Sequence, residues 1–245
     1  MHRATRILPF ALTAAALAAC SGDSNGPTAG FECLGQALPT TAPALIAVSG
    51  QVRQNAILPN ALRGAYVFAF RTGDTTTLAA DTSDTPGAYS LSITTGGMPV
   101  NGYMRATDSA HITTYAYPAV PLAANATENI LMVTTAEFSF LAAAAGITPV
   151  AGDGFIGLVV TNCAGTPLAG ATVSSNPAGQ VRYNAGDAGG APSSTAMSTA
   201  SDGVAYIANV AAGNVTVQAS ASGHTLRSHI VNARADAITL TQIQP

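Results

Sequence analysis

The sequence predicts an all-β protein built from two tandem β-sandwich domains with a short helix between them. Three features support this prediction: a composition poor in charge, short strands separated by turn residues, and an internal repeat. Only 9% of the 245 residues are charged. Few charges, together with many β-forming and turn-forming residues, favour extracellular β structure over a cytoplasmic enzyme.

Several segments alternate apolar and polar residues with the period of two that is typical of half-buried strands. Examples are GATV (170–173), VAYIANV (204–210) and NVTVQASA (214–221), and glycine, proline, asparagine or aspartate residues separate such segments. Each half of the chain spans about 90 residues of this kind, a size that suits a small seven-stranded sandwich.

Three segments of the first half, at 49–70, 82–93 and 102–111, recur in the same order in the second half. Equal order with slightly different spacing indicates two copies of one fold with loops of different length. The offsets are 107 residues from Gly50 to Gly157, 117 from Tyr89 to Tyr206, and 111 from Gly102 to Gly213.

The repeat divides the chain into segments. We expect the first β-sandwich at 46–134, a connector at 135–152 and the second β-sandwich at 153–245. Residues 20–45 are expected to form a polar tether followed by an extended segment that lies over one domain.

The connector contains the pattern of a short helix. Thr135 can cap its N-terminus, Glu137 favours the positive end of the helix dipole, and Gly146 can end it in the left-handed conformation. A β-strand through 136–142 is the competing interpretation. The residues expected to share the buried face of the helix are Phe138, Leu141 and Ala145.

Residues 1–19 have the features of a secretory signal peptide. Arg3 and Arg6 precede an apolar run at 7–19 that ends in small residues. This run is too short for a membrane-spanning helix, which needs about 20 apolar residues. A buried core helix is the alternative, but the polar residues that follow fit it poorly.

The residues Leu17-Ala18-Ala19-Cys20 resemble the bacterial lipobox, in which the cysteine is acylated and becomes the mature N-terminus. The resemblance therefore predicts an N-terminal lipoprotein signal with Cys20 as the lipidation site and the membrane as a partner. Several acyl chains give stable anchoring. Ser21 after the cysteine resembles signals for the outer membrane, so we expect a cell-envelope location there, on either the periplasmic or the surface face.

Without residues 1–19, seven of the nine arginines remain against all twelve acidic residues. This acidic balance argues against nucleic acid and anionic lipid as partners, because both require basic patches. With Cys20 acylated, Cys33 and Cys163 remain as an even pair in an oxidising compartment, which predicts a disulfide. Two buried free thiols are the alternative.

The stretches at 157–173 and 199–224 resemble the carboxypeptidase regulatory-like domain, a transthyretin-like β-sandwich. The pattern of that family fixes turns and core positions, so the resemblance implies a transthyretin-like or immunoglobulin-like sandwich and implies little about activity. The matching positions are Gly157, Pro167, Leu168, Gly170, Ala171, Val173, Asp202, Gly203, Gly213 and Val217.

The resemblance is weaker at several positions. Asn214 and His224 depart from the pattern in the second copy. In the first copy, Arg63 precedes Gly64 and the dipeptide Pro86-Gly87 stands where the family has Asp-Gly.

No recognised motif for catalysis, phosphate binding or metal binding occurs in the sequence. His224 and His229 are five residues apart and would point to opposite faces of a strand. His111 lies near Tyr115 and Tyr117 but lacks the spacing that iron-binding dioxygenases of related fold require. We therefore expect no catalytic residue, no metal ligand and no cofactor.

Tyr103, Tyr115 and Tyr117 include candidates for an exposed face on which glycan rings could stack, with core packing as the alternative. The expected function is a non-catalytic structural or binding role for an exported lipoprotein, with a glycan or a protein as possible ligand. The alternatives are an accessory glycan- or peptide-binding subunit of a surface uptake system and, less favoured, a metal-dependent enzyme.

Overall fold

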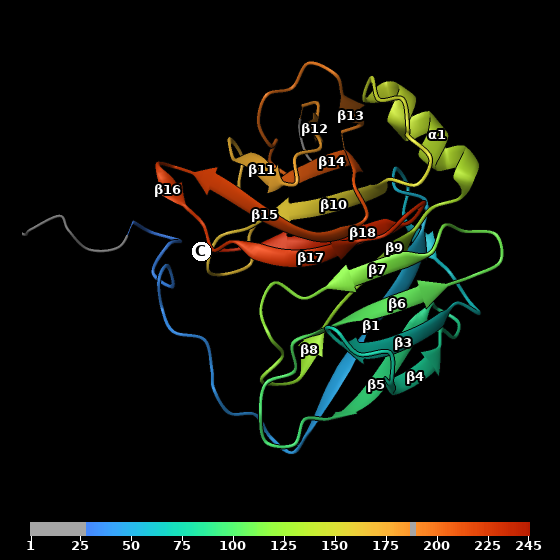
Figure 1. The fold of residues 1–245 in the computed structure, drawn as a ribbon, viewed down its shortest axis with the longest axis vertical. Helices are drawn as coiled ribbons and strands as arrows, with labels where there is room; N and C mark the ends of the chain where they lie inside the picture. Colours follow the sequence, from blue (N-terminus) through green and yellow to red (C-terminus); the bar gives the residue numbers. More distant parts are fainter. Residues whose placement is uncertain (1–27, 187–189) are drawn as a thin grey trace, which may run out of the picture.

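The computed structural model describes residues 28–186 and 190–245 and has the predicted all-β architecture (Figure 1). The predicted signal peptide at 1–19 and the lipidation site Cys20 lie outside the described residues. No helix in the described part is long and apolar enough to cross a membrane.

The first copy is a sandwich of two sheets. Its strands are β1 (Leu45–Gln54), β2 (Asn60–Ala61), β3 (Tyr66–Arg71), β4 (Thr77–Thr82), β5 (Ala88–Thr94), β6 (Gly102–Thr107), β7 (Thr114–Tyr117), β8 (Ala126–Thr127) and β9 (Ile130–Met132). Strand β1 pairs with β5 in antiparallel and with β8 and β9 in parallel orientation. The facing layer has the order β7-β6-β3-β4. Side chains such as Val48, Leu91, Val67 and Met104 fill the space between the layers.

The second copy repeats this arrangement. Its strands are β10 (Gly154–Val160), β11 (Thr172–Asn176), β12 (Gln180–Asn184), β13 (Pro192–Ser193), β14 (Val204–Val210), β15 (Gly213–Ala221), β16 (His224–Thr225), β17 (His229–Ala233) and β18 (Ile238–Ile243). Strand β10 pairs with β14 in antiparallel and with β18 in parallel orientation. The facing layer contains β11, β15, β16 and β17. The second core includes Ile156, Leu158, Ile207, Val215 and Val231.

Corresponding hydrogen bonds occur in both copies. The Val52 N–H donates to the Gly87 carbonyl, and the Val160 N–H donates to the Gly203 carbonyl, both at 2.8 Å. Together with the equivalent strand pairings, these bonds show that the repeat represents two copies of one fold.

The expected alignment of the repeat is wrong by one residue at two of its three reference points. Gly50 and Tyr89, which lie opposite each other on β1 and β5, face the first core. Gly157 and Tyr206, opposite each other on β10 and β14, face away from the second core, to which their strand neighbours belong. A shift of one residue reverses the face on which every side chain of a strand lies. The shared hydrogen bonds give offsets of 108 and 116 residues in place of 107 and 117.

The two copies are joined through one continuous sheet. Strand β7 pairs in parallel with β18, which creates a nine-stranded sheet of order β13-β12-β14-β10-β18-β7-β6-β3-β4 (Figure 1). On β7, Ala116 belongs to the first core and the adjacent Tyr117 to the second. Because successive strand residues point to opposite faces, the two covering layers lie on opposite faces of the joint sheet.

The predicted connector helix is present as α1 (Thr135–Ala144). Its N-cap is Thr134, one residue before the expected Thr135, and the Thr134 hydroxyl accepts a hydrogen bond from the Glu137 N–H at 3.2 Å. Gly146 has a φ of 65° and ends the helix as expected. Phe138 packs edge-on against Phe155 of β10, with ring centroids 5.2 Å apart.

The segment before β1 lies over the second copy and then crosses to the first. Phe31 is buried in the second core, and the predicted disulfide between Cys33 and Cys163 is present. The Cys163 N–H donates to the Gly30 carbonyl at 2.9 Å. This segment therefore ties the residues that precede β1 to the second copy.

We expect the double substitution Cys33→Ser, Cys163→Ser to lower the free energy of unfolding by about 2–5 kcal/mol, because the bridge restricts a long loop in the unfolded chain. Urea denaturation measures this change. Wild-type protein under reducing conditions is the matched control and should unfold like the variant. Equal stability of oxidised wild type and variant would contradict the prediction.

Candidate functional site

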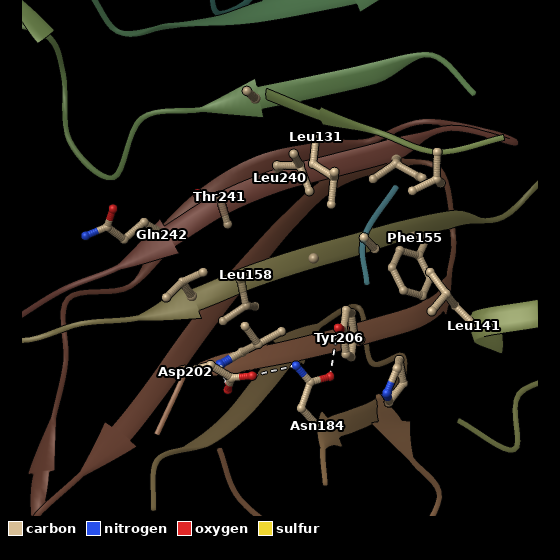
Figure 2. Close-up of a pocket in the computed structure, with 18 of the residues that line it drawn as sticks. Leu131, Leu141, Phe155, Leu158, Asn184, Asp202, Tyr206, Leu240, Thr241 and Gln242 are labelled. Carbon is tan, nitrogen blue, oxygen red and sulfur yellow. Dashed lines mark hydrogen bonds between the residues drawn. The ribbon is translucent and has the colours of Figure 1, made fainter. Parts of the chain in front are cut away.

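A cavity of about 630 Å³ lies at the junction of the two copies (Figure 2). Its floor is the outer face of β10, β14 and β18, the face that the covering layer of the second copy leaves free. The strand formed by β8 and β9 contributes one wall, and α1, the loop after β1 and residues of β7, β12 and β13 also contribute to the lining. Apolar and aromatic lining residues include Leu131, Leu141, Phe155, Val159, Tyr206 and Leu240.

Gly157 opens the centre of the floor. It lies between Leu240 on β18 and Tyr206 on β14, the residues opposite it on the two neighbouring strands. An added Cβ at Gly157 would come 3.2 Å from the Leu240 Cδ2 atom and within 4 Å of nothing else. The Phe155 ring lies further along β10, with its centroid 5.8 Å from that of Tyr206. The floor is thus apolar and has a depression at its centre.

One corner of the cavity is polar but internally satisfied. The Asn184 side-chain N–H donates to the Asp202 carboxylate at 2.6 Å, and the Tyr206 hydroxyl donates to the Asn184 side-chain oxygen at 2.9 Å (Figure 2). The second Asp202 oxygen accepts the Val204 N–H at 3.0 Å. Burial raises the pKa of Tyr206 to about 12, so the phenol keeps its proton at neutral pH.

Glu128 is the lining residue with the most perturbed carboxyl group. It lies between β8 and β9, where its N–H donates to the Ser49 carbonyl and its carbonyl accepts the Tyr89 hydroxyl at 2.6 Å. Burial raises the pKa of the Glu128 carboxyl to about 7. The carboxyl therefore changes its charge near neutral pH at the edge of an apolar cavity.

Exposed apolar side chains lie on the loop after β1, beside the cavity. Ile57 lines the cavity and is 45% exposed, and the adjacent Leu58 is 75% exposed. The Glu137 carboxylate accepts a hydrogen bond from the Ala56 N–H, which ties the loop after β1 to the helix. This side of the cavity is therefore apolar and held by a contact between the first copy and the connector.

The three candidate tyrosines come together on the face of β6 and β7 opposite the first core, and of the three Tyr117 alone is among the residues that line the cavity. Tyr103 stacks on Phe70 at 5.3 Å and on Tyr117 at 5.2 Å between ring centroids, and Tyr115 lies 5.9 Å from Tyr103. Tyr103 and Tyr115 are half-buried. Tyr117 is only 4% exposed and belongs to the second core, as in the alternative of core packing.

Two arginines lie over ring faces of this aromatic cluster. The Arg234 guanidinium lies over Tyr115 at 4.3 Å and over Tyr103 at 5.1 Å, and that of Arg105 lies over Phe70 at 5.2 Å. Such contacts stabilise the cation on the ring face. The ring faces are therefore occupied by neighbours, which leaves little flat surface for a sugar ring.

The histidines lie apart from one another. His111 contacts Asp108 at 2.6 Å and Gln54 at 3.1 Å, and not the nearby tyrosines. His229 contacts the Thr241 hydroxyl at 2.8 Å, and burial lowers its pKa to about 4. Within the described ranges, no group of three or more histidine, cysteine, aspartate or glutamate residues is arranged to hold a metal ion.

Sequence reasoning missed the cavity, although it named some of the lining residues for other reasons, such as Tyr117 as a candidate ligand contact and Phe138 and Leu141 on the buried face of the helix. Glu128, Gly157 and Leu240 belong to no chemical motif, and their proximity depends on the pairing of β7 with β18. One signal was available in the sequence. Gly157 stands between the apolar residues Ile156 and Leu158, so a strand that turns those two side chains into the core places Gly157 on the opposite face.

No family model matches the sequence, and no curated protein matches it. Solved structures with a similar arrangement include the shaft pilin SpaA of Lactobacillus rhamnosus GG, with 10% identity, a TM-score of 0.24 and coverage of 84% of this chain and 98% of the pilin. GBS52, the minor pilin of Streptococcus agalactiae, has 12% identity, a TM-score of 0.26 and coverage of 81% and 95%. The Bacillus anthracis TIE protein has 9% identity and a TM-score of 0.27; 82% of this chain matches 35% of that protein. At these scores the similarity supports no conclusion about function.

We expect Glu128→Gln to stabilise the protein at pH 8 and to have little effect at pH 4. The pKa of Glu128 is about 7 in the folded state and about 4.5 when unfolded, so the folded carboxyl holds its proton longer and the wild type loses stability as pH rises between these values. The difference at pH 8 should be on the order of 2 kcal/mol. Urea denaturation at both pH values tests this, and a difference that does not depend on pH would contradict it.

Proposed function

We propose that this chain is an exported, lipid-anchored protein of the bacterial cell envelope that binds an apolar segment of a partner and catalyses no reaction. The observation that carries the proposal is the cavity at the junction, because both copies and the connector contribute to its lining. A mostly apolar concave site with a few fixed polar groups is typical of binding sites.

The surroundings of the cavity support an apolar partner. Ile57, which lines the cavity, and the adjacent Leu58 expose large apolar side chains. Clustered exposed apolar residues are typical of interaction sites in soluble domains. A bound partner would cover these side chains and place its own apolar groups above the depression at Gly157.

The polar groups of the cavity support binding more than catalysis. The Asn184, Asp202 and Tyr206 side chains hydrogen-bond one another, and Tyr206 stays protonated. Burial raises the pKa of the Glu128 carboxyl to about 7. General acid–base catalysis normally needs such a group beside a second reactive group, and Glu128 has no hydrogen-bonded side-chain partner among the described residues.

Export and anchoring rest on the first part of the sequence and on the disulfide. Disulfides persist in oxidising compartments, which is consistent with export.

The resemblance to the carboxypeptidase regulatory-like domain remains part of the proposal. It is supported by Gly203, which has a φ of 67° and whose added Cβ would come 2.5 Å from the Val160 carbonyl oxygen, so that a glycine is required there.

We expect Val159→Trp to fill the cavity and to weaken binding of the neutral apolar dye Nile red by about tenfold or more. Fluorescence titration measures the dissociation constant. Ile230→Trp is the matched control, because Ile230 is 60% exposed on β17 and does not line the cavity. Equal affinity of the two variants would contradict the assignment of the cavity as the binding site.

We expect intact mass spectrometry of the protein from a bacterial membrane fraction to show a chain that begins at Cys20 and carries acyl groups. Cys20→Ala should abolish processing and release the protein from the membrane, because the acyl chains supply the anchor. A full-length, unmodified wild-type chain would contradict the lipoprotein assignment and leave the cavity assignment untouched.

A further inference from the structure

We infer that the unpaired edge of the β8–β9 strand receives an extended peptide segment of a protein partner, which adds a parallel strand above the cavity floor. This inference rests on the proposed binding function and specifies how the main chain of the partner is held.

The orientation of the main chain at Glu128 shows which groups are free. The Glu128 N–H donates to the Ser49 carbonyl at 2.8 Å, so the backbone groups of Glu128 face β1. In an extended strand the main-chain groups of adjacent residues point to opposite edges, so those of Thr127 and Asn129 face away from β1. Within the described part of the chain, β8 and β9 pair with β1 alone. The second edge is therefore free at Thr127 and Asn129. The Asn129 side-chain oxygen accepts the Gln51 N–H on the β1 side at 2.9 Å, and the free edge ends at Val133, whose carbonyl accepts the Ile112 N–H at 2.9 Å.

The second copy shows what such an edge can bind. Ile130 lies opposite Val52 in the first copy, and Ile243 lies opposite Val160, the counterpart of Val52, in the second. The β8–β9 strand thus corresponds to β18, with an offset of 113 residues.

Residues 125–128 correspond by this offset to 238–241, the stretch of β18 that pairs in parallel with β7. The Ile238 N–H, for example, donates to the Thr113 carbonyl at 3.1 Å. The same edge of the same fold carries a parallel strand in one copy and no strand in the other.

The free edge opens on the cavity. Thr127 and Asn129 line it, above a floor that contains Gly157 and Leu240. Packed sheets lie about 10 Å apart, so a strand added to this edge would lie above the floor in the layer of β1. Every second side chain of the added strand would point down to the floor, which is apolar. The occupant is therefore an extended segment with apolar residues at alternate positions, bound by addition to a sheet edge.

A labelled synthetic peptide with the sequence of residues 112–118, which includes β7, is a suitable probe because β7 occupies the corresponding edge in the second copy. We expect it to bind the full chain, and we expect N-methylation of one alternate set of its amides to weaken binding by about tenfold or more, while methylation of the other set has little effect. Fluorescence anisotropy measures both affinities.

Thr127→Pro locates the edge. It removes one outward N–H, and proline is tolerated at an edge strand where the N–H faces away from the sheet. Thr127→Val keeps this N–H and is the matched control. We expect the peptide to lose affinity for Thr127→Pro alone, while Nile red binds all three proteins equally.

Three results would overturn the inference. They are peptide binding that tolerates N-methylation of either set of amides, peptide binding unchanged by Thr127→Pro, and failure of the peptide to bind a protein that binds Nile red normally. All three leave the cavity as an apolar binding site. Failure of the wild type to bind Nile red would instead remove the proposed function itself.

Discussion

The parallel pairing of β7 with β18 is the contact on which the architecture depends. It connects different layers of the two copies, since β7 lies in the layer that faces β1 and β18 lies beside β10. Side chains reinforce it: the Thr241 hydroxyl donates to the Tyr117 carbonyl at 3.1 Å, and the His229 ring contacts the same hydroxyl at 2.8 Å. Without this pairing the two copies would share no continuous sheet.

In each copy, one face of the joint sheet is covered by the facing layer of that copy and the other face is not. These two uncovered faces carry different side chains. On the first copy, the face carries Phe70, Tyr103 and Tyr115, with Arg105 and Arg234 laid over the rings. Large side chains thus cover that face. On the second copy, Gly157 leaves the centre of the face low, and α1 and the β8–β9 strand stand beside it, so that a cavity remains. Similar folds therefore give one filled face and one face that can accept a ligand.

Local features of the structure were predictable from the sequence. Alternating segments, the connector helix and its end at Gly146, and the pair of Cys33 and Cys163 all depend on short-range patterns or on counting, and the structure contains them. The N-cap was displaced by one residue to Thr134, because Thr134 and Thr135 are equally suitable by composition. An error of one residue in the N-cap does not change where the helix lies in the fold.

The joint sheet and the cavity were not predictable, because they depend on contacts between distant residues. Tyr115 and Thr239 face each other across β7 and β18, although the two strands belong to different copies. No local pattern records that pairing. Glu128 likewise belongs to no motif, and its raised pKa results from burial at a junction that the sequence does not reveal.

The two copies pair their strands alike, but a glycine–tyrosine pair lies one position apart along them, and this small change creates a site. In the first copy, Gly50 and Tyr89 face inwards, and the Tyr89 hydroxyl holds the Glu128 carbonyl at 2.6 Å. In the second copy, the similar pair of Gly157 and Tyr206 faces outwards and becomes the cavity floor. Since strand side chains alternate, moving such a pair by one position along its strands converts a core pair into a surface pair. The β10–β14 ladder contains a register irregularity between Gly154 and Ile156, so the second copy departs from regular pairing at the start of this strand. The second copy thus keeps the shared topology of the fold while it exposes a glycine and a tyrosine where a ligand can reach them.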